Sequence, residues 1–544
     1  MINSLALLSA SCGVLLFFHR RVLTYLRYFQ QEEYNGQRFL AWFWRYRAFD
    51  RRGSVICLLT LLVTGGLTVI APTSLTLLGW LLGAGALAWI AWREDDPRKT
   101  GKVTLKITQR ARRIWYTASG LFLGVVLVMT ILWWLTVSNG YLPFYWLIVL
   151  LLIQCSPFLL ILANRILAPY ERGIQQSFRA EACTVLAKVD PTVIGITGSY
   201  GKTSTKTILG ALLDTVAPTF WSPGSINTEM GLVREIRERL KTGYRFAIIE
   251  MGAYGIGSIR KLCNLTPPQV GVITYVGVMH LERFGSQEAI YQAKSELAQA
   301  VPESGILVCN GDNPGARRMA AEYPKARTLL YGLNPEDAQL DCWMSDIAIT
   351  VAGTQFVIHW DGQAYPGTTP LLGQPMLSNL LAAFTTACAL GAHPTALIAA
   401  TRNLSPPAHR LELRQQYGAL VIDDSYNSNP VGFAEALAIL GQLPGRRKLL
   451  ITPGMIELGE LQESENRRLA TLAATVCDLV LVVGETNAKA FAEGLQAGGA
   501  GADRAQFFPH RESARAYLEK TVAEGDVILW ENDLPDIYED QPSF

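Results

Sequence analysis

The residues best suited to chemistry form the run Thr-Gly-Ser-Tyr-Gly-Lys-Thr-Ser at positions 197–204. The run follows a short β-branched stretch that predicts a strand, and it precedes a stretch of small and apolar residues that predicts a helix. Glycines let backbone N–H groups turn toward an anion, and the helix N-terminus adds positive potential. A lysine can then reach the outer phosphates, and a hydroxyl suits Mg²⁺. The run therefore predicts a phosphate-binding loop that comprises Gly198, Ser199, Tyr200, Gly201, Lys202, Thr203 and Ser204.

The elements around this loop are predicted to form an α/β arrangement from about Pro191 onward. Short β-branched runs alternate there with longer helical stretches, which indicates strands joined by helices in a mostly parallel sheet. The first strands are predicted at residues 193–196, 246–249, 270–275 and 306–309, and a second set at residues 420–422, 448–452, 479–483 and 527–530. Pro406 and Pro407 interrupt any helix between the two sets, so a domain boundary is predicted at residue 405.

The spacing TGxxGKTS departs from the standard phosphate-binding loop, which would place a glycine where this chain has Ile196. This variant resembles the Mur ligase superfamily, the ATP-dependent enzymes that join amino acids to a carboxylate. Further matching motifs follow in order: Glu250 in IIEMGA, His280 in VGVMHLERFGS, Lys294 in QAKSEL, Asn310 in NGDN, Asn379 in LSNLLAA, Arg410 in HRLEL, and DDSYNSNP at residues 423–430. The resemblance covers roughly residues 191–535 and is closest to the branch that adds D-alanyl-D-alanine to the peptidoglycan precursor.

The resemblance implies a role for each motif once ATP is bound. It implies two Mg²⁺ sites, and the residues that would hold the metal ions are Thr203, Glu250, His280 and Lys294, the last as a carbamate. The implied ATP contacts outside the loop are Asn310, Asn379, Arg410, Asp424 and Asn427. Lys202, His280, Lys294 and Arg410 are the predicted catalytic residues. Arg410 would neutralise charge that develops on the γ-phosphoryl group, and Asp424 would hold the ribose hydroxyls.

The predicted function is an ATP-dependent carboxylate–amine ligase that acts through an acyl phosphate in cell-envelope or peptide-polymer synthesis. The carboxylate acceptor and the amine donor are left open. The alternative is a nucleotide-gated membrane module that regulates a partner subunit without ligation. Lys294 and Arg410 favour the ligase, because phosphate binding alone requires neither.

The N-terminal part of the chain has a different composition, because nearly all the long uncharged runs of the whole chain lie before residue 167. Five runs approach the ~20 residues that cross a bilayer, at residues 2–18, 54–71, 75–92, 114–137 and 142–163. A signal peptide is the alternative for the first run, but basic residues follow that run rather than precede it. The basic and aromatic loops 19–53 and 93–113 are predicted to face the cytoplasm, which places the N-terminus outside and the catalytic domains inside.

The predicted fold class is therefore an α-helical membrane domain followed by two α/β domains, a P-loop Mur ligase central domain and a Rossmann-like C-terminal domain. The predicted parts are a multi-pass inner-membrane domain at 1–166, a linker helix at 167–190, the central domain at 191–404 and the C-terminal domain at 405–544. The lipid bilayer is an expected partner. A net charge of +2 with 17% charged residues gives no field for nucleic-acid binding, so nucleic acid is excluded.

Overall fold

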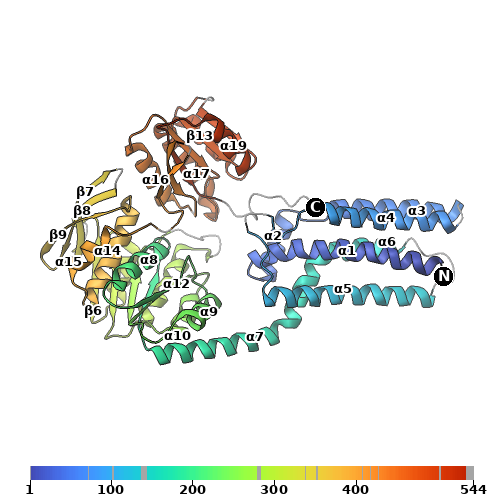
Figure 1. Cartoon of the computed structure of the whole chain (residues 1–544), viewed down its shortest axis with the longest axis horizontal. Helices are drawn as coiled ribbons and strands as arrows, with labels where there is room; N and C mark the ends of the chain where they lie inside the picture. The colour runs from blue at the N-terminus through green and yellow to red at the C-terminus, as the bar shows by residue number, and fades with distance from the viewer. Residues whose placement is uncertain are drawn as a thin grey trace. The chain divides into compact units, whose positions relative to one another are not determined.

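The computed structural model describes residues 2–70, 73–100, 103–136, 144–277, 284–336, 339–350, 353–406, 408–416, 418–426, 428–501 and 504–533. The described residues divide into two compact units, one at 2–174 and one at 175–533. The first unit is helical, and the second contains both β-sheets (Figure 1). Two predicted site residues, His280 and Asn427, lie outside the described residues.

The helices of the first unit enclose an aromatic core. They are α1 (Ile2–Gln31), α2 (Gly36–Arg45), α3 (Arg51–Ile70), α4 (Thr73–Arg93), α5 (Gln109–Thr136), α6 (Phe144–Gln154) and α7 (Ser156–Val189), the last of which continues into the second unit. Tyr28 of α1 stacks on Trp42 of α2 with ring centroids 4.3 Å apart. Gly83 lets α4 approach α3 closely, since a Cβ at this position would lie 2.4 Å from the Thr60 hydroxyl.

A buried ion pair fixes one end of this helical unit. The Arg21 Nε atom lies 2.6 Å from an Asp50 carboxylate oxygen, and both side chains are almost fully buried. Glu94 at the end of α4 accepts a second bond from Arg21 at 2.7 Å. Buried charges are costly unless they are paired, so this cluster holds α1, the α2–α3 connection and the end of α4 together.

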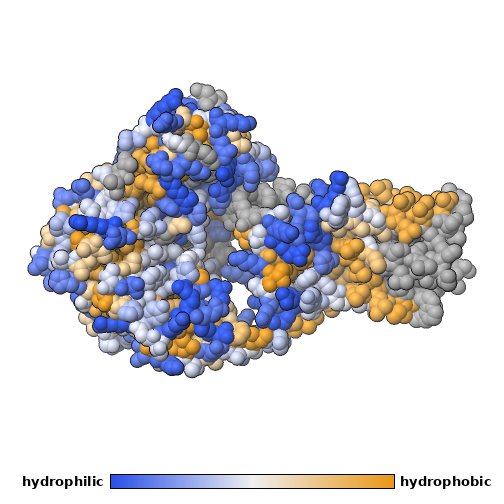
Figure 2. All heavy atoms as spheres, viewed as in Figure 1, coloured by the Kyte–Doolittle hydropathy of each residue, from blue (hydrophilic) through white to orange (hydrophobic). Residues whose placement is uncertain are grey.

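The outer surface of the helical unit carries many apolar side chains (Figure 2). Exposed leucines and tryptophans include Leu59 and Leu62 on α3 and Leu82 and Trp92 on α4. No single helix within the described residues combines the length and the apolar composition of a membrane span; α6 and α7 meet that criterion only as a pair bent by 60°. The structure therefore does not support the predicted five-span membrane domain, although parts of those spans lie outside the described residues.

The larger sheet of the second unit has the strand order β2-β3-β1-β4-β5-β6-β7-β8-β9. Its strands are β1 (Thr192–Thr197), β2 (Thr219–Trp221), β3 (Phe246–Glu250), β4 (Val270–Ile273), β5 (Ile306–Asn310), β6 (Arg327–Gly332), β7 (Cys342–Thr350), β8 (Gly353–Trp360) and β9 (Gln363–Thr369). Pairing is parallel from β2 to β7 and antiparallel from β7 to β9. The antiparallel extension was not predicted from the sequence.

Helices cover both faces of the parallel part, as the continuous apolar strands require. The helices of this region are α8 (Lys202–Asp214), α9 (Glu229–Arg239), α10 (Ser258–Leu265), α12 (Gln287–Ala300), α13 (Pro314–Glu322), α14 (Gln374–Ala389) and α15 (Pro394–Thr401). Ile194 and Ile196 of β1 belong to the core formed with α8 and α14. Val193, the neighbour on the opposite face, belongs to the core formed with α9, α10 and α12.

The smaller sheet has the order β10-β11-β15-β12-β13-β14, and it is parallel except for the β10–β11 pair. Its strands are β10 (Glu412–Gln416), β11 (Ala419–Asp424), β12 (Lys448–Thr452), β13 (Leu479–Val483), β14 (Ala505–Phe508) and β15 (Val527–Glu531). The helices α16 (Pro430–Gln442), α17 (Gln462–Val476), α18 (Ala488–Ala497) and α19 (Arg511–Thr521) flank this sheet. The two predicted α/β sets are thus present in the predicted order.

Candidate functional site

The phosphate-binding loop connects β1 to α8, as its sequence predicts. Gly201 caps α8 with φ of +82°, a left-handed conformation that favours glycine. A Cβ at Gly201 would lie 2.2 Å from the Asn379 side-chain oxygen, and one at Gly198 would lie 2.0 Å from the Thr274 hydroxyl. Both glycines are therefore required by the close approach of neighbouring side chains, which leaves no room for a Cβ at either turn of the loop.

Lys202 lies against its own loop. Its Nζ donates to the Gly198 carbonyl oxygen at 2.7 Å, and burial lowers the pKa of Lys202. The Ser199 carbonyl oxygen accepts a longer bond from the same ammonium group at 3.4 Å, so backbone acceptors hold Lys202 at the loop. A phosphate oxygen would offer this ammonium a charged acceptor in place of the neutral carbonyl, which is the stronger kind of hydrogen bond.

Glu250 lies at the end of β3, the strand next to β1, and three side chains donate to its carboxylate. Thr203 Oγ1 and Lys206 Nζ each lie 3.0 Å from Oε2, and Asn227 Nδ2 lies 3.1 Å from Oε1. Oxygen ligands of this kind suit Mg²⁺, and the Thr203 hydroxyl beside Glu250 supplies a second one. No group of three or more His, Cys, Asp or Glu side chains positioned for a metal ion occurs within the described ranges. The protein ligands of a metal ion here would be few, with phosphate oxygens completing its coordination.

Lys206 is a site residue that the sequence analysis missed. Its side chain is fully buried, and its Nζ donates to the Gly224 carbonyl oxygen at 2.5 Å as well as pairing with Glu250. Its position four residues after Lys202 places both lysines on one side of α8, and that spacing is the signal that could have found it.

Lys294 lies on α12 with only 5% of its surface exposed. Burial is the main reason that its pKa lies well below the ordinary lysine value, and the nearby charge of Lys202 lowers it further. The predicted metal ligand thus lies near the phosphate-binding loop. Its predicted companion His280 cannot be placed, since it lies outside the described residues.

Arg410 and Asp424 come from the second α/β set and line the same cavity as Lys202, Thr203 and Glu250. The cavity has a volume of about 260 Å³. The Arg410 guanidinium lies 4.5 Å from the centre of the Tyr426 ring, and the Tyr426 hydroxyl bonds to Ser225 of the first set. The linker arginine therefore faces the phosphate-binding loop across one shared cavity.

Backbone strain surrounds Arg410. The residues on either side of it, His409 and Leu411, have φ values of +62° and +50°. Residues other than glycine rarely adopt this left-handed backbone conformation. Leu411 donates its backbone N–H to Asp424 at 3.2 Å, so the strained segment is tied directly to β11.

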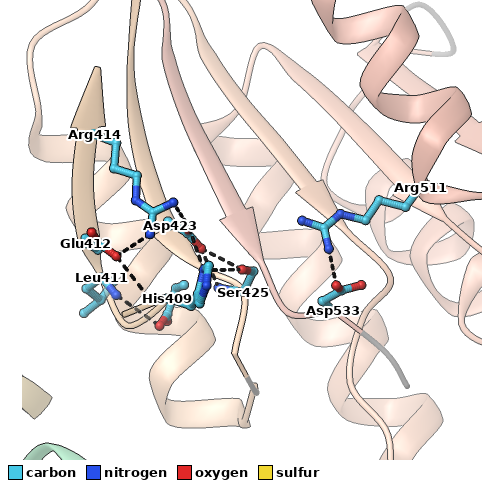
Figure 3. A network of polar contacts seen from close by, with 9 residues as sticks. His409, Leu411, Glu412, Arg414, Asp423, Ser425, Arg511 and Asp533 are labelled. Carbon is cyan, nitrogen blue, oxygen red and sulfur yellow. Dashed lines mark hydrogen bonds and ion pairs between the residues drawn. The ribbon is translucent and has the colours of Figure 1, made fainter. Parts of the chain in front are cut away.

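A polar network beside this segment holds it in place (Figure 3). Asp423 accepts from His409 Nδ1 at 2.8 Å and from Ser425 Oγ at 2.6 Å, and it lies 3.2 Å from Arg414. Burial opposes ionisation of Asp423, but the bonds from Ser425 and His409 outweigh it and lower its pKa. Arg414 also donates to Glu412 at 2.6 Å, and a separate ion pair joins Arg511 to Asp533.

A second cavity, of about 200 Å³, lies on the other side of Tyr200 and Gly201. Its apolar wall includes Tyr275 and Pro375, and its polar residues include Asn310 and Asn379. The remaining lining residues that bear on its chemistry are Leu333, Ser378, Val431 and Glu435. A flat aromatic base fits such a cavity, so the two cavities together have the polarity of a nucleotide, charged at one end and apolar at the other.

Two domain families match the part of the chain that forms this site. Residues 196–387 match the Mur ligase middle domain, and residues 409–531 match the family described as Mur ligase, glutamate ligase domain. A UDP-N-acetylmuramoyl-tripeptide–D-alanyl-D-alanine ligase of Mycobacterium tuberculosis is 34% identical in an alignment of 361 residues, and the match covers 62% of this chain and 69% of that protein. The chain belongs to the Mur ligase family. It is therefore an ATP-dependent ligase that forms amide bonds.

Other relatives agree with this assignment to the Mur ligases. The UDP-N-acetylmuramoyl-tripeptide–D-alanyl-D-alanine ligase of Escherichia coli is 29% identical over 65% of this chain and 76% of its own length. The crystal structure of MurF ligase from Thermotoga maritima in complex with ADP is similar with a TM-score of 0.59 and 28% identity, over 68% of this chain and 82% of that one. MurF from Acinetobacter baumannii has the same TM-score at 24% identity, over 66% of this chain and 77% of its own, and supports the fold alone.

A glycine-to-alanine pair tests the loop geometry. Gly201→Ala should weaken ADP binding at least tenfold, because the new methyl group collides with Asn379 in addition to straining the backbone. Gly257→Ala is the matched control: Gly257 also caps a helix, with φ of +88°, but nothing lies within 4 Å of its Cβ position. Both variants should lose about 1 kcal/mol of stability from left-handed backbone strain, measured by urea unfolding. Equal ADP affinities, measured by calorimetry, would show that the contact with Asn379 does not shape the loop.

Proposed function

We propose that this Mur ligase joins a carboxylate to an incoming amine through an acyl phosphate, in peptidoglycan synthesis. The carrying observation is the single cavity that gathers Lys202, Glu250 and Arg410 from two α/β sets. A free carboxylate is a poor acylating agent, so ATP must first phosphorylate it. The acceptor oxygen attacks the γ-phosphorus and ADP leaves; the amine then attacks the acyl carbon, phosphate leaves, and the amine loses a proton.

The substrate classes of this proposal come from the relatives. Those ligases are named for UDP-N-acetylmuramoyl-tripeptide and D-alanyl-D-alanine, and the match with this chain covers 69% of the M. tuberculosis protein. We therefore propose a muramoyl-peptide carboxylate as the acceptor and D-alanyl-D-alanine as the amine donor.

The cations of the cavity have separate tasks in this proposal. Lys202 is held at the loop and would bind the outer phosphates, whereas Arg410 approaches from the strained linker and would stabilise charge on the transferring phosphoryl group. Asp424 would hold the ribose hydroxyls, and Asn310 and Asn379 would contact the adenosine end in the second cavity. Closure of the second α/β set over the first would exclude water from the acyl phosphate.

Thr203 and Glu250 would hold Mg²⁺ beside the phosphates. When bound, Mg²⁺ neutralises phosphate charge and orients the phosphoryl group. Lys206 and Asn227 position the Glu250 carboxylate for this task through their bonds to its two oxygens. A second Mg²⁺, with His280 as a ligand, remains part of the proposal.

We propose that Lys294 carries a carbamate, which would turn a buried cation into an anionic ligand. Carbon dioxide reacts with the neutral form of an amine, and burial on α12 favours that form. A negative carbamate would also relieve the repulsion between Lys294 and Lys202.

We also propose that the helical unit associates with the cytoplasmic face of the inner membrane through its apolar surface. Exposed Leu62 and Leu82 are 70% and 65% accessible, and large exposed apolar patches mark membrane or protein contacts. Exposed Arg51, Arg52 and Arg93 flank the apolar parts of α3 and α4 and would bind anionic headgroups.

The ligase proposal predicts coupled ADP and amide formation. Purified protein with ATP, Mg²⁺, a muramoyl-tripeptide and D-alanyl-D-alanine should release one ADP for each product molecule detected by mass spectrometry. Arg410→Ala should lower kcat about 100-fold or more while ADP affinity changes little, because its charge acts mainly on the transferring group. Arg468→Ala, on the surface of α17, is the control. ADP release without any acylated product, with every acceptor tried, would contradict ligation.

The carbamate proposal predicts chemical rescue. Lys294→Ala should lose most activity and regain part of it when a short carboxylate such as acetate is added, because the acid supplies the missing anionic ligand. Lys188→Ala removes an exposed lysine of α7 that lines neither cavity, and its activity should not change with or without acetate. Full activity of Lys294→Ala without acetate would contradict the role.

The membrane proposal predicts flotation with vesicles. The protein should float with phosphatidylglycerol–phosphatidylethanolamine vesicles in a density gradient, and the double variant Leu62→Glu, Leu82→Glu should float less. Leu461→Glu, an exposed leucine of the other unit, is the matched control. Equal flotation of the double variant and the control would show that α3 and α4 do not contact lipid.

A further inference from the structure

Two carboxyl groups meet beneath the cavity, at the ends of neighbouring parallel strands. Asp424 ends β11, Glu531 ends β15, and the two residues are paired in the register of the sheet. Asp424 lines the cavity, whereas Glu531 has no exposed surface. Glu531 therefore reaches a ligand only through Asp424.

The hydrogen bonds of Glu531 leave one oxygen without a donor. Its Oε1 accepts from Ser428 Oγ at 2.5 Å. Its Oε2 is buried and has no hydrogen-bond donor among the described residues. A buried carboxylate oxygen without a donor, next to a second carboxylate, costs several kcal/mol unless a proton lies between the two groups.

The proton balance of the pair supports such a shared proton. Burial is the main cause that raises the pKa of both groups, to about 7 for Asp424 and well above the ordinary value for Glu531. Repulsion between the two carboxyl groups raises the pKa of Glu531 further, and Arg410 acts in the opposite direction on Asp424. Glu531 is thus the protonated partner and Asp424 the ionised one at pH values above neutrality.

We propose that Glu531 is a positioning residue, which donates its proton to Asp424 and thereby fixes the Asp424 carboxylate toward the nucleotide. The inference rests on the proposed nucleotide site and deepens it. Asp424 also accepts the Leu411 N–H at 3.2 Å, and its carbonyl oxygen accepts the Asn532 N–H at 3.1 Å. The linker therefore holds the Asp424 carboxylate, the residue after β15 holds the Asp424 backbone, and the Asp424 side chain lines the cavity.

The arrangement makes nucleotide binding depend on pH. The charged groups that act on the pair are Arg410 from the linker, Asp423 from β11 and the two carboxyl groups themselves, and Ser428 and Leu411 contribute neutral donors. As the pH falls through 7, Asp424 becomes protonated and the pair then holds two protons. This removes the negative charge that faces Arg410 and the best acceptor for a ribose hydroxyl. Affinity should therefore fall as the pH decreases.

The test compares Glu531→Gln with the wild-type protein by calorimetry of ADP binding at pH 6 and pH 8. The amide keeps the shape of the side chain, donates N–H to Asp424 permanently and still accepts from Ser428. The wild-type protein should bind ADP about tenfold more weakly at pH 6 than at pH 8. The surface control Glu463→Gln, which keeps the Asp424–Glu531 pair, should show the same change. Glu531→Gln also donates to Asp424 and leaves its burial unchanged, so this variant should keep the wild-type affinity and pH dependence. Glu531→Leu, which has no donor, should bind ADP about tenfold more weakly than wild type at pH 8.

Infrared spectroscopy gives a second readout that needs no nucleotide. The wild-type protein at pH 8 should show a protonated carboxylic-acid band that Glu531→Gln lacks and Glu463→Gln keeps. Wild-type ADP affinity of Glu531→Leu at pH 8, or an equal loss of affinity in Glu531→Leu and Glu531→Gln, would overturn the positioning role. Absence of ADP binding in every protein would overturn the proposed function instead, and the infrared band would still decide whether the proton is shared.

Discussion

An excess of buried positive charge at the ends of β1 and β3 governs the catalytic unit. Lys206 is almost fully buried, Lys202 is held at the loop, and Arg410 faces them across the cavity, whereas the Glu250 carboxylate pairs directly with Lys206. Buried charges of one sign are costly without partners. A polyphosphate supplies the missing negative charge, so the site is stabilised most when a nucleotide occupies it, and a carbamate on Lys294 would act in the same direction.

The strained linker connects this charge balance to the second α/β set. His409 and Leu411 hold left-handed backbone conformations that cost free energy, and the bonds of Asp423 and Asp424 offset that cost. The strain keeps Arg410 directed into the cavity. Asp424 thus links three features of the site, namely the linker, the cavity and the buried partner Glu531.

The sequence predicted those features that depend on local spacing. The glycines and lysine of the phosphate-binding loop, the strand before them and the proline break before Arg410 follow from residue types within a few positions of one another. Lys206 and Glu531 were missed because their importance depends on partners far along the chain, Glu250 and Asp424. The apolar runs before residue 167 lie in helices, but the run at 142–163 is divided between α6 and α7 rather than forming one span. Hydropathy also did not show that charged groups such as Arg21 and Asp50 would be buried between those helices.

Oxygen transfer from acceptor to phosphate tests the central claim most directly. A muramoyl-peptide acceptor labelled with ¹⁸O in its carboxylate should be incubated with ATP, Mg²⁺ and D-alanyl-D-alanine, and the released phosphate analysed by mass spectrometry. We expect one labelled oxygen in each phosphate, because the carboxylate oxygen that attacks ATP leaves with the phosphoryl group when the amide forms. Unlabelled phosphate released together with the amide product would contradict activation of the carboxylate by ATP in this cavity.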